Sequence, residues 1–198
     1  MTKFYRFAKI VAGPLYRIMF RFRVTGKENI PAEGGVILCA NHTSMQDTVV
    51  LGVACPRQLH FLAKHELWNI KYLRWLFDAL GGIPVNRENP SMESFKRTVA
   101  ILKDGRAIAI FLQGGRRQEL DQADAKAGVA LFAVKGRVPV VPVHISSKFR
   151  IFSKVRINIG APISFEDYWD KKVRTEQLND IAGRIMDAIA GLRPAIEN

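Results

Sequence analysis

Apolar residues gather along this chain in short runs, separated by longer stretches in which apolar and polar residues mix. Three runs are almost wholly apolar, which is typical of strands buried on both faces; they are 35–40, 107–112 and 138–145. Shorter extended segments are predicted at 20–24, 59–63, 83–85 and 155–159. A spacing of three to four residues predicts helices at 44–54, 67–80, 91–103, 124–135 and 175–190. This alternation predicts an α/β fold: a single domain with a mixed, mostly parallel sheet flanked by helices.

The first 24 residues carry a separate pattern. Their apolar residues recur on one face of a helix, at Phe4, Phe7, Val11, Leu15, Ile18 and Phe22. Six basic residues interrupt the segment, which contains no acid. The apolar stretches between them are too short for a transmembrane span or for the apolar region of a signal peptide. Gly13-Pro14 is expected to bend this helix, with Pro14 opening its second half.

Two interpretations of this segment remain open: a helix lying on a lipid surface, or an ordinary amphipathic helix packed on the domain. The basic charge favours the lipid surface, since each basic residue near an anionic membrane contributes about 1 kcal/mol. We therefore divide the chain into a membrane-associating segment, 1–24, and an α/β domain, 25–198.

The net charge of the whole chain is +12, from 30 Lys and Arg against 18 Asp and Glu. Such a chain is attracted to polyanions, among them nucleic acid, anionic lipid and acidic proteins. The charge is spread along the sequence and no nucleic-acid-binding module is found, so nucleic acid is not an expected partner.

The two cysteines, Cys39 and Cys55, match no metal or redox spacing and lie in apolar surroundings. We expect both to be small buried hydrophobic residues, as in a reducing compartment.

Polar residues follow the apolar run 35–40 directly, in the order Asn41, His42 and, five residues after His42, Asp47. With His42 in a loop and Asp47 in the first turn of a helix, the carboxylate could orient the imidazole as a general base. The alternative is purely structural, because Ser44-x-x-Asp47 is also a capping-box pattern. Residue types alone favour the capping box.

Two further apolar segments end in arginine, at 81–87 and 111–117, and the second has a glycine pair before it. Glycines let backbone amides approach a phosphate, and arginine binds it with a planar fork. Alone, each pattern is more often a turn with a solvated arginine. The segment 138–143, of sequence VPVVPV, is most simply a core strand.

Taken together and in this order, the four segments resemble the glycerophospholipid acyltransferase family. The family block N-H-x-x-x-x-D is complete here, the second block ends at Arg87 with Asn86 where Asp is usual, and V-P-V-x-P-V is intact. The third block, F-P-E-G-T-R, reads FLQGGR, so that Gln113 stands in place of the usual Glu. The resemblance runs from about residue 20 to 163 and implies a site composed of His42 and Asp47 as catalytic pair and Asn41, Lys64, Arg87, Gln113, Gly114, Arg116 and Lys126 as substrate-binding residues.

The resemblance also implies a reaction. His42 would deprotonate the sn-2 hydroxyl of lysophosphatidic acid, and the oxygen would attack the thioester of acyl-CoA or acyl-carrier protein, giving phosphatidic acid. No cofactor and no metal are expected. Such an enzyme would lie on the cytoplasmic face of the membrane as a peripheral or monotopic protein, with an anionic membrane surface as its partner.

The acceptor is the open point, because Gln113 lacks the charge of the usual Glu and Gly114-Gly115 is similar to the related glycerol-3-phosphate acyltransferases. The alternatives are an acyltransferase that uses glycerol 3-phosphate or another lysolipid, and a catalytically weak family member that binds lipid.

Overall fold

The computed structural model describes residues 1–86, 91–112, 128–146 and 149–194, and contains one seven-stranded sheet in the order β1-β7-β6-β2-β5-β3-β4. The strands are β1 (Arg21–Thr25), β2 (Val36–Ala40), β3 (Leu59–Lys64), β4 (Ile83–Val85), β5 (Ala107–Phe111), β6 (Val140–Ser146) and β7 (Lys154–Ile159). All pairs are parallel except β6 with β7, which is antiparallel. The predicted mixed, mostly parallel sheet is confirmed.

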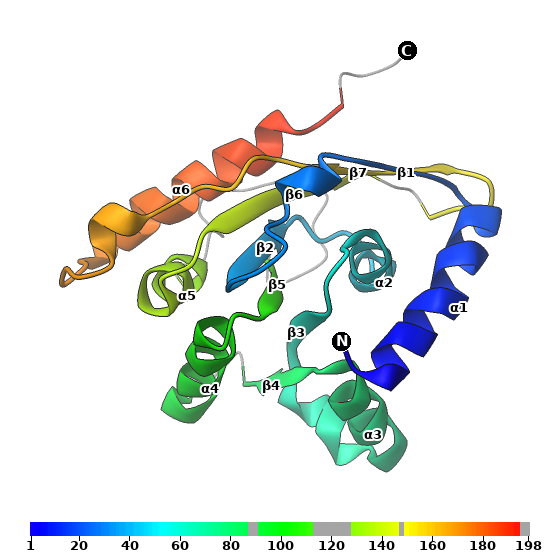
Figure 1. Cartoon of the computed structure of the whole chain (residues 1–198), viewed down its shortest axis with the longest axis horizontal. Helices are drawn as coiled ribbons and strands as arrows, with labels where there is room; N and C mark the ends of the chain where they lie inside the picture. The colour runs from blue at the N-terminus through cyan, green and yellow to red at the C-terminus, as the bar shows by residue number, and fades with distance from the viewer. Residues whose placement is uncertain (87–90, 113–127, 147–148, 195–198) are drawn as a thin grey trace.

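Helices cover both faces of this sheet (Figure 1). They are α1 (Lys3–Met19), α2 (Gln46–Ala54), α3 (Lys71–Leu80), α4 (Met92–Lys103), α5 (Gly128–Gly136) and α6 (Thr175–Gly191), with short 3-10 turns η1 (Lys27–Asn29), η2 (His65–Asn69) and η4 (Glu166–Tyr168). The part of the predicted helix 124–135 that precedes Gly128 lies outside the described residues.

The central strand β2 explains why its run is wholly apolar. Val36, Leu38 and Ala40 join the core on the side of α2, whereas Ile37 and Cys39 join the core on the side of α5 and α6. Successive side chains of a strand point to opposite faces, so a strand covered on both sides needs apolar residues at every position.

The helix ends follow local sequence signals in two cases. The hydroxyl of Ser91 accepts the backbone N–H of Ser94 at 3.1 Å, so Ser91 is the N-cap of α4. At the end of α3, Gly81 adopts a left-handed conformation with φ of +81°, which a residue with a side chain adopts only under strain.

The first helix packs on the domain with one side and leaves another side exposed. Tyr5 and Gly13 are buried, whereas the predicted apolar face is exposed at Phe7, Val11, Leu15 and Ile18. The helix continues through Pro14 to Met19, and Arg21–Thr25 then pairs with β7, so the first strand begins inside the range 1–24. Across the described residues, no helix is both long enough and apolar enough to cross a bilayer.

Both cysteines are buried thiols without a disulfide. Burial raises the pKa of Cys39 and that of Cys55, so neither is activated as a nucleophile.

Candidate active site

His42 and Asp47 face each other at the carboxyl end of β2, where the chain turns into α2. The Nδ1 atom of His42 lies 3.1 Å from Oδ2 of Asp47. Because a carboxylate only accepts hydrogen bonds, this contact places the proton of a neutral imidazole on Nδ1. The Nε2 atom then keeps its lone pair, as a general base requires.

The carboxylate of Asp47 is held in place by the loop that it closes. Its Oδ2 atom accepts the backbone N–H groups of Thr43, at 2.6 Å, and Ser44, at 2.7 Å. Two charge-assisted bonds of this kind fix the carboxylate and, through it, the imidazole.

The structural and the chemical interpretations of this segment are therefore compatible. Asp47 reaches back to the amide of Ser44, as the fourth residue of a capping box does. The hydroxyl of Ser44, however, accepts the amide of Gln46, at 3.3 Å, and α2 begins after Met45. The same carboxylate thus closes the loop and contacts His42.

The two side chains of this pair differ in burial. The side chain of Asp47 is fully buried, while that of His42 is 14% exposed. Within the described part of the chain, Oδ1 of Asp47 has no hydrogen-bond partner. A buried carboxylate is costly unless its charge is compensated, and the two amides, the imidazole and the first turn of α2 provide that compensation.

Phe111 forms one wall of the site, and its ring stacks on His42 with centroids 4.3 Å apart and planes 29° apart. The sheet register brings them together, since Ala40 of β2 pairs with Phe111 of β5. In the sequence, Phe111 stands out only as the first residue of the third family block. The contact depends on which strands are neighbours, and a single sequence does not give that order.

Asn41 joins the end of β2 to β6. Its side-chain amide donates to the carbonyl of Ile145, at 2.9 Å, and its carbonyl accepts the N–H of Ile145, at 2.7 Å. This pair of bonds extends the sheet by one residue and fixes the chain immediately before His42. Lys64 lies exposed at the end of β3.

The remaining predicted substrate-binding residues lie outside the described residues: Arg87, Gln113, Gly114, Arg116 and Lys126. They stay predictions. Among the residues that the structure does describe, no group of three His, Cys, Asp or Glu side chains could hold a metal ion.

A cavity of about 300 Å³ adjoins the stacked ring of Phe111. Its walls are mostly apolar and come from β3, β4, α4, β5 and α5, with lining residues that include Leu62, Val85, Phe95, Ile110, Phe111 and Phe132. Two of the lining residues, Phe95 and Phe132, stack on each other with ring centroids 5.2 Å apart. This volume is at the lower end for small-ligand pockets, and the lining suits an apolar group.

Comparison with known proteins agrees with this architecture. Residues 21–146 match the model of the family described as Acyltransferase. A 1-acyl-sn-glycerol-3-phosphate acyltransferase of Bacillus subtilis is 34% identical over 152 residues, which are 74% of this chain and 75% of that protein. The protein of that name from Streptococcus pneumoniae is 32% identical over 75% of this chain and 57% of its own length.

Among solved structures, the 1-acyl-sn-glycerophosphate (LPA) acyltransferase PlsC of Thermotoga maritima shares the fold. Its TM-score is 0.73 at 23% identity, over 95% of this chain and 78% of the other. The family match covers well over half of the sequence and includes the loop of His42 and Asp47. The chain therefore belongs to the acyltransferase family.

Proposed function

We propose that this protein transfers a fatty acyl chain from acyl-CoA or acyl-carrier protein to the sn-2 hydroxyl of 1-acylglycerol 3-phosphate, giving phosphatidic acid for phospholipid synthesis. The observation that carries the proposal is the contact between Nδ1 of His42 and the buried carboxylate of Asp47. The names of the related proteins from Bacillus subtilis and Streptococcus pneumoniae support the acceptor.

In the proposed mechanism, Nε2 of His42 takes the proton of the acceptor hydroxyl while the oxygen attacks the thioester carbonyl carbon. The imidazolium that forms is stabilised by Asp47, 3.1 Å away on its other side. The tetrahedral intermediate then collapses, the carbon–sulfur bond breaks, and the thiolate takes the proton back from His42. The imidazole returns to its starting state, and no acyl-enzyme is formed.

The acceptor phosphate requires cations close to this pair. We assign that task to Arg87, Arg116 and Lys126, and we assign oxyanion stabilisation to a backbone amide near Gly114. Gln113 would accept a hydrogen bond from the glycerol through its carbonyl oxygen. These assignments rest on the motif order in the sequence.

We further propose that the protein acts at an anionic membrane surface, on the cytoplasmic side. The exposed side of α1 carries large apolar residues, with Phe7 62% and Ile18 73% exposed. At the start of α1, Phe4 contacts Trp75 of α3, itself 62% exposed, with ring centroids 5.1 Å apart. At its end, the N–H of Phe152, a residue 69% exposed, donates to the carbonyl of Met19 at 2.7 Å.

Helix α1, helix α3 and the segment 151–152 thus carry exposed apolar side chains close to one another. We call this set the apolar face: Phe7, Ile10, Val11, Leu15, Ile18, Trp75, Ile151 and Phe152. Exposed apolar residues gathered in this way mark interaction surfaces, and the arginines of the same helix suit anionic headgroups. In Figure 1, α1 runs along the outside of the molecule beside α2, with α3 at its first end.

One experiment tests the reaction. Purified protein is given lysophosphatidic acid or glycerol 3-phosphate as acceptor, with acyl-CoA or acyl-carrier protein as donor. His42→Ala should abolish turnover with the productive pair. His65→Ala is the matched control, since His65 is half exposed beside Glu66, and it should keep the activity. If no pair of substrates turns over, or if His42→Ala stays fully active, the proposed function is wrong.

A second experiment tests the membrane surface. Phe7→Glu with Ile18→Glu should weaken binding to anionic vesicles strongly, because two apolar side chains are lost and two negative charges gained. Asn179→Glu with Ala190→Glu makes the same charge change on exposed positions of α6, away from α1. Equal vesicle binding by the two double variants would contradict the proposed surface.

A further inference from the structure

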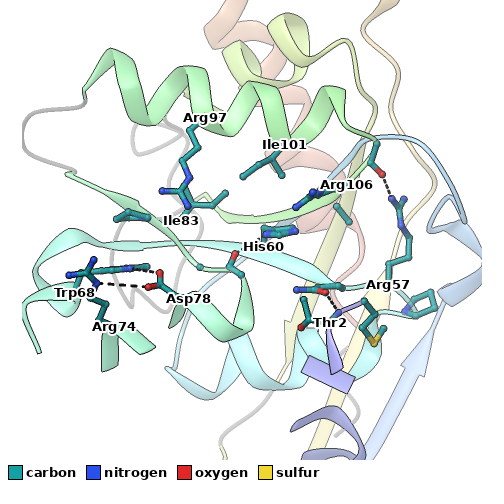
Figure 2. Close-up of a pocket in the computed structure, with 18 residues that line it drawn as sticks. Thr2, Arg57, His60, Trp68, Arg74, Asp78, Ile83, Arg97, Ile101 and Arg106 are labelled. Atoms are coloured by element: carbon teal, nitrogen blue, oxygen red, sulfur yellow. Dashed lines mark hydrogen bonds and ion pairs between the residues drawn. The ribbon is translucent and has the colours of Figure 1, made fainter. Parts of the chain in front are cut away.

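A second and larger hollow lies at the opposite end of the sheet from His42. Its volume is about 1380 Å³, and it opens at the amino ends of β3, β4 and β5, between α3 and α4 (Figure 2). The strand register explains it. β5 pairs with β3 at Leu59–Phe61, whereas β4 pairs with β3 only at Leu62–Lys64. The first half of β3 therefore lacks a neighbouring strand on the β4 side, and the hollow lies where that strand would be.

The charged residues that line this hollow are mostly basic. Four arginines face a single acid, Asp78, among the lining residues: Arg57, Arg74, Arg97 and Arg106. Two of the four have partners. The guanidinium of Arg57 donates to the carbonyls of Pro31, Gly34 and Gly105, at 2.9, 2.7 and 2.6 Å. Arg74 lies 4.0 Å from Asp78, which also accepts the indole N–H of Trp68.

Arg97 and Arg106 differ, because neither has an ion pair in the described part of the chain. Arg97 extends from α4 into the hollow, and Arg106 lies just before β5, near His60 (Figure 2). Both are exposed to solvent at the mouth. Two guanidinium groups that line one cavity and are not paired with a carboxylate are suited to binding a phosphate group.

His60 forms the floor between them and is only 9% exposed. Its Nδ1–H donates to the carbonyl of Gly81 at 2.8 Å, so that Nε2 is unprotonated in the neutral ring. Burial lowers the pKa of His60, and the charges of Arg106 and Arg97 lower it further. The positive field of the two arginines thus reaches the floor of the hollow, where an anion would be attracted.

We propose that this hollow binds a phosphate monoester, with Arg97 and Arg106 as its ligands, at a site separate from that of His42. The position of the hollow favours a lipid phosphate as the source. Its wall includes Thr2 and α3, which adjoin the first end of the apolar face. A protein resting on that face would have this mouth among the lipid headgroups.

The test follows the imidazole signal of His60 by NMR during titration with two probes, short-chain phosphatidic acid and inorganic phosphate. A phosphate near the ring favours the charged imidazolium, so binding should move the signal and raise the pKa of His60. Saturation by phosphatidic acid alone identifies a lipid site. Saturation by inorganic phosphate as well identifies a site that binds the phosphate group without the lipid. Either result supports the site.

The double variant Arg97→Gln with Arg106→Gln should bind the probe more weakly by a factor on the order of ten or more. Lys171→Gln with Lys172→Gln removes the same charge from exposed positions distant in sequence, and it should bind as wild type does. Thermal unfolding checks that both variants fold. The site does not exist if neither probe moves the His60 signal, or if both variants bind equally.

This test is independent of acyl transfer. His42→Ala should leave the His60 titration unchanged, so the phosphate site and the proposed function can fail separately.

Discussion

Replacing Asp47 by Asn tests the proposed role of its charge. The amide oxygen of Asn can take the place of Oδ2 and accept the N–H groups of Thr43 and Ser44, which lie 2.6 and 2.7 Å from it. It can also accept Nδ1–H of His42. The loop geometry should therefore survive, while the negative charge beside the developing imidazolium is lost.

The size of the effect follows from the distance between the two groups. Two unit charges 3.1 Å apart attract each other by about 5 kcal/mol at an effective dielectric constant of about 20, which is an upper bound. A hydrogen bond to a charged partner exceeds a neutral one by about 1 to 2 kcal/mol, which is a lower bound. Because each increase of about 1.4 kcal/mol in the activation free energy slows a reaction tenfold, kcat should fall by a factor of roughly ten to several thousand.

The assay measures initial rates with lysophosphatidic acid and the preferred donor, together with urea unfolding of each variant. Asp47→Asn should lose rate and about 1 to 2 kcal/mol of stability, because its NH2 group takes the buried position of Oδ1, which has no partner among the described residues. Asp47→Ala should lose about 3 kcal/mol, because two amides lose a charged acceptor. Full activity of a folded Asp47→Asn variant would refute the role of the charge in the reaction.

Three further predictions follow from single contacts. Phe111→Leu removes the ring stacked 4.3 Å from His42; the fold should lose about 1 kcal/mol in urea unfolding, and kcat should fall several-fold, whereas unchanged kcat would show that the ring does not position the base. Gly81→Ala places a Cβ 2.8 Å from Nδ1 of His60 at φ of +81°, so the unfolding free energy should fall by about 2 kcal/mol, and a wild-type value would contradict that strain. Burial lowers the pKa of His144 to about 4, so the folded state disfavours protonation of this side chain. The unfolding free energy should be highest above pH 6.5 and should decline as the pH falls from 6.5 towards 4; in urea unfolding between pH 7 and 5, His144→Asn should flatten that decline.

The sheet could be predicted from the sequence because its central strands are buried on both sides. β2 and β5 read as unbroken apolar runs, and the polar residues that follow them mark their carboxyl ends. The observed strand ends differ from the predicted ones by one or two residues, because the side chains at these positions do not determine where a strand ends. The strand order was not predictable, because it depends on contacts between segments distant in sequence.

The candidate pair was predictable for a local reason. His42 and Asp47 are separated by one tight loop, whose geometry is set by the amides of Thr43 and Ser44. The basic hollow had no such signal, since His60, Arg97 and Arg106 come from β3, from α4 and from the turn before β5, and belong to no motif. Only the register of β3 against β4 and β5 brings these residues together.

The two ends of the sheet set a limit on what each site can do. β2 and β5 pair in register over five residues, from Val36 with Ala107 to Ala40 with Phe111. At about 3.3 Å per residue, Arg106 and His42 lie roughly 20 Å apart along the strands. In the proposed acceptor, phosphate and sn-2 hydroxyl are separated by only a few bonds, so a phosphate held by Arg106 cannot belong to the molecule that reacts at His42. The cations that hold the reacting acceptor must come from segments that leave the sheet at the end of His42, and the chain leaves β4 at Val85 and β5 at Phe111 on that same end. A phosphate group bound in the basic hollow therefore lies too far from His42 to contact the reacting groups.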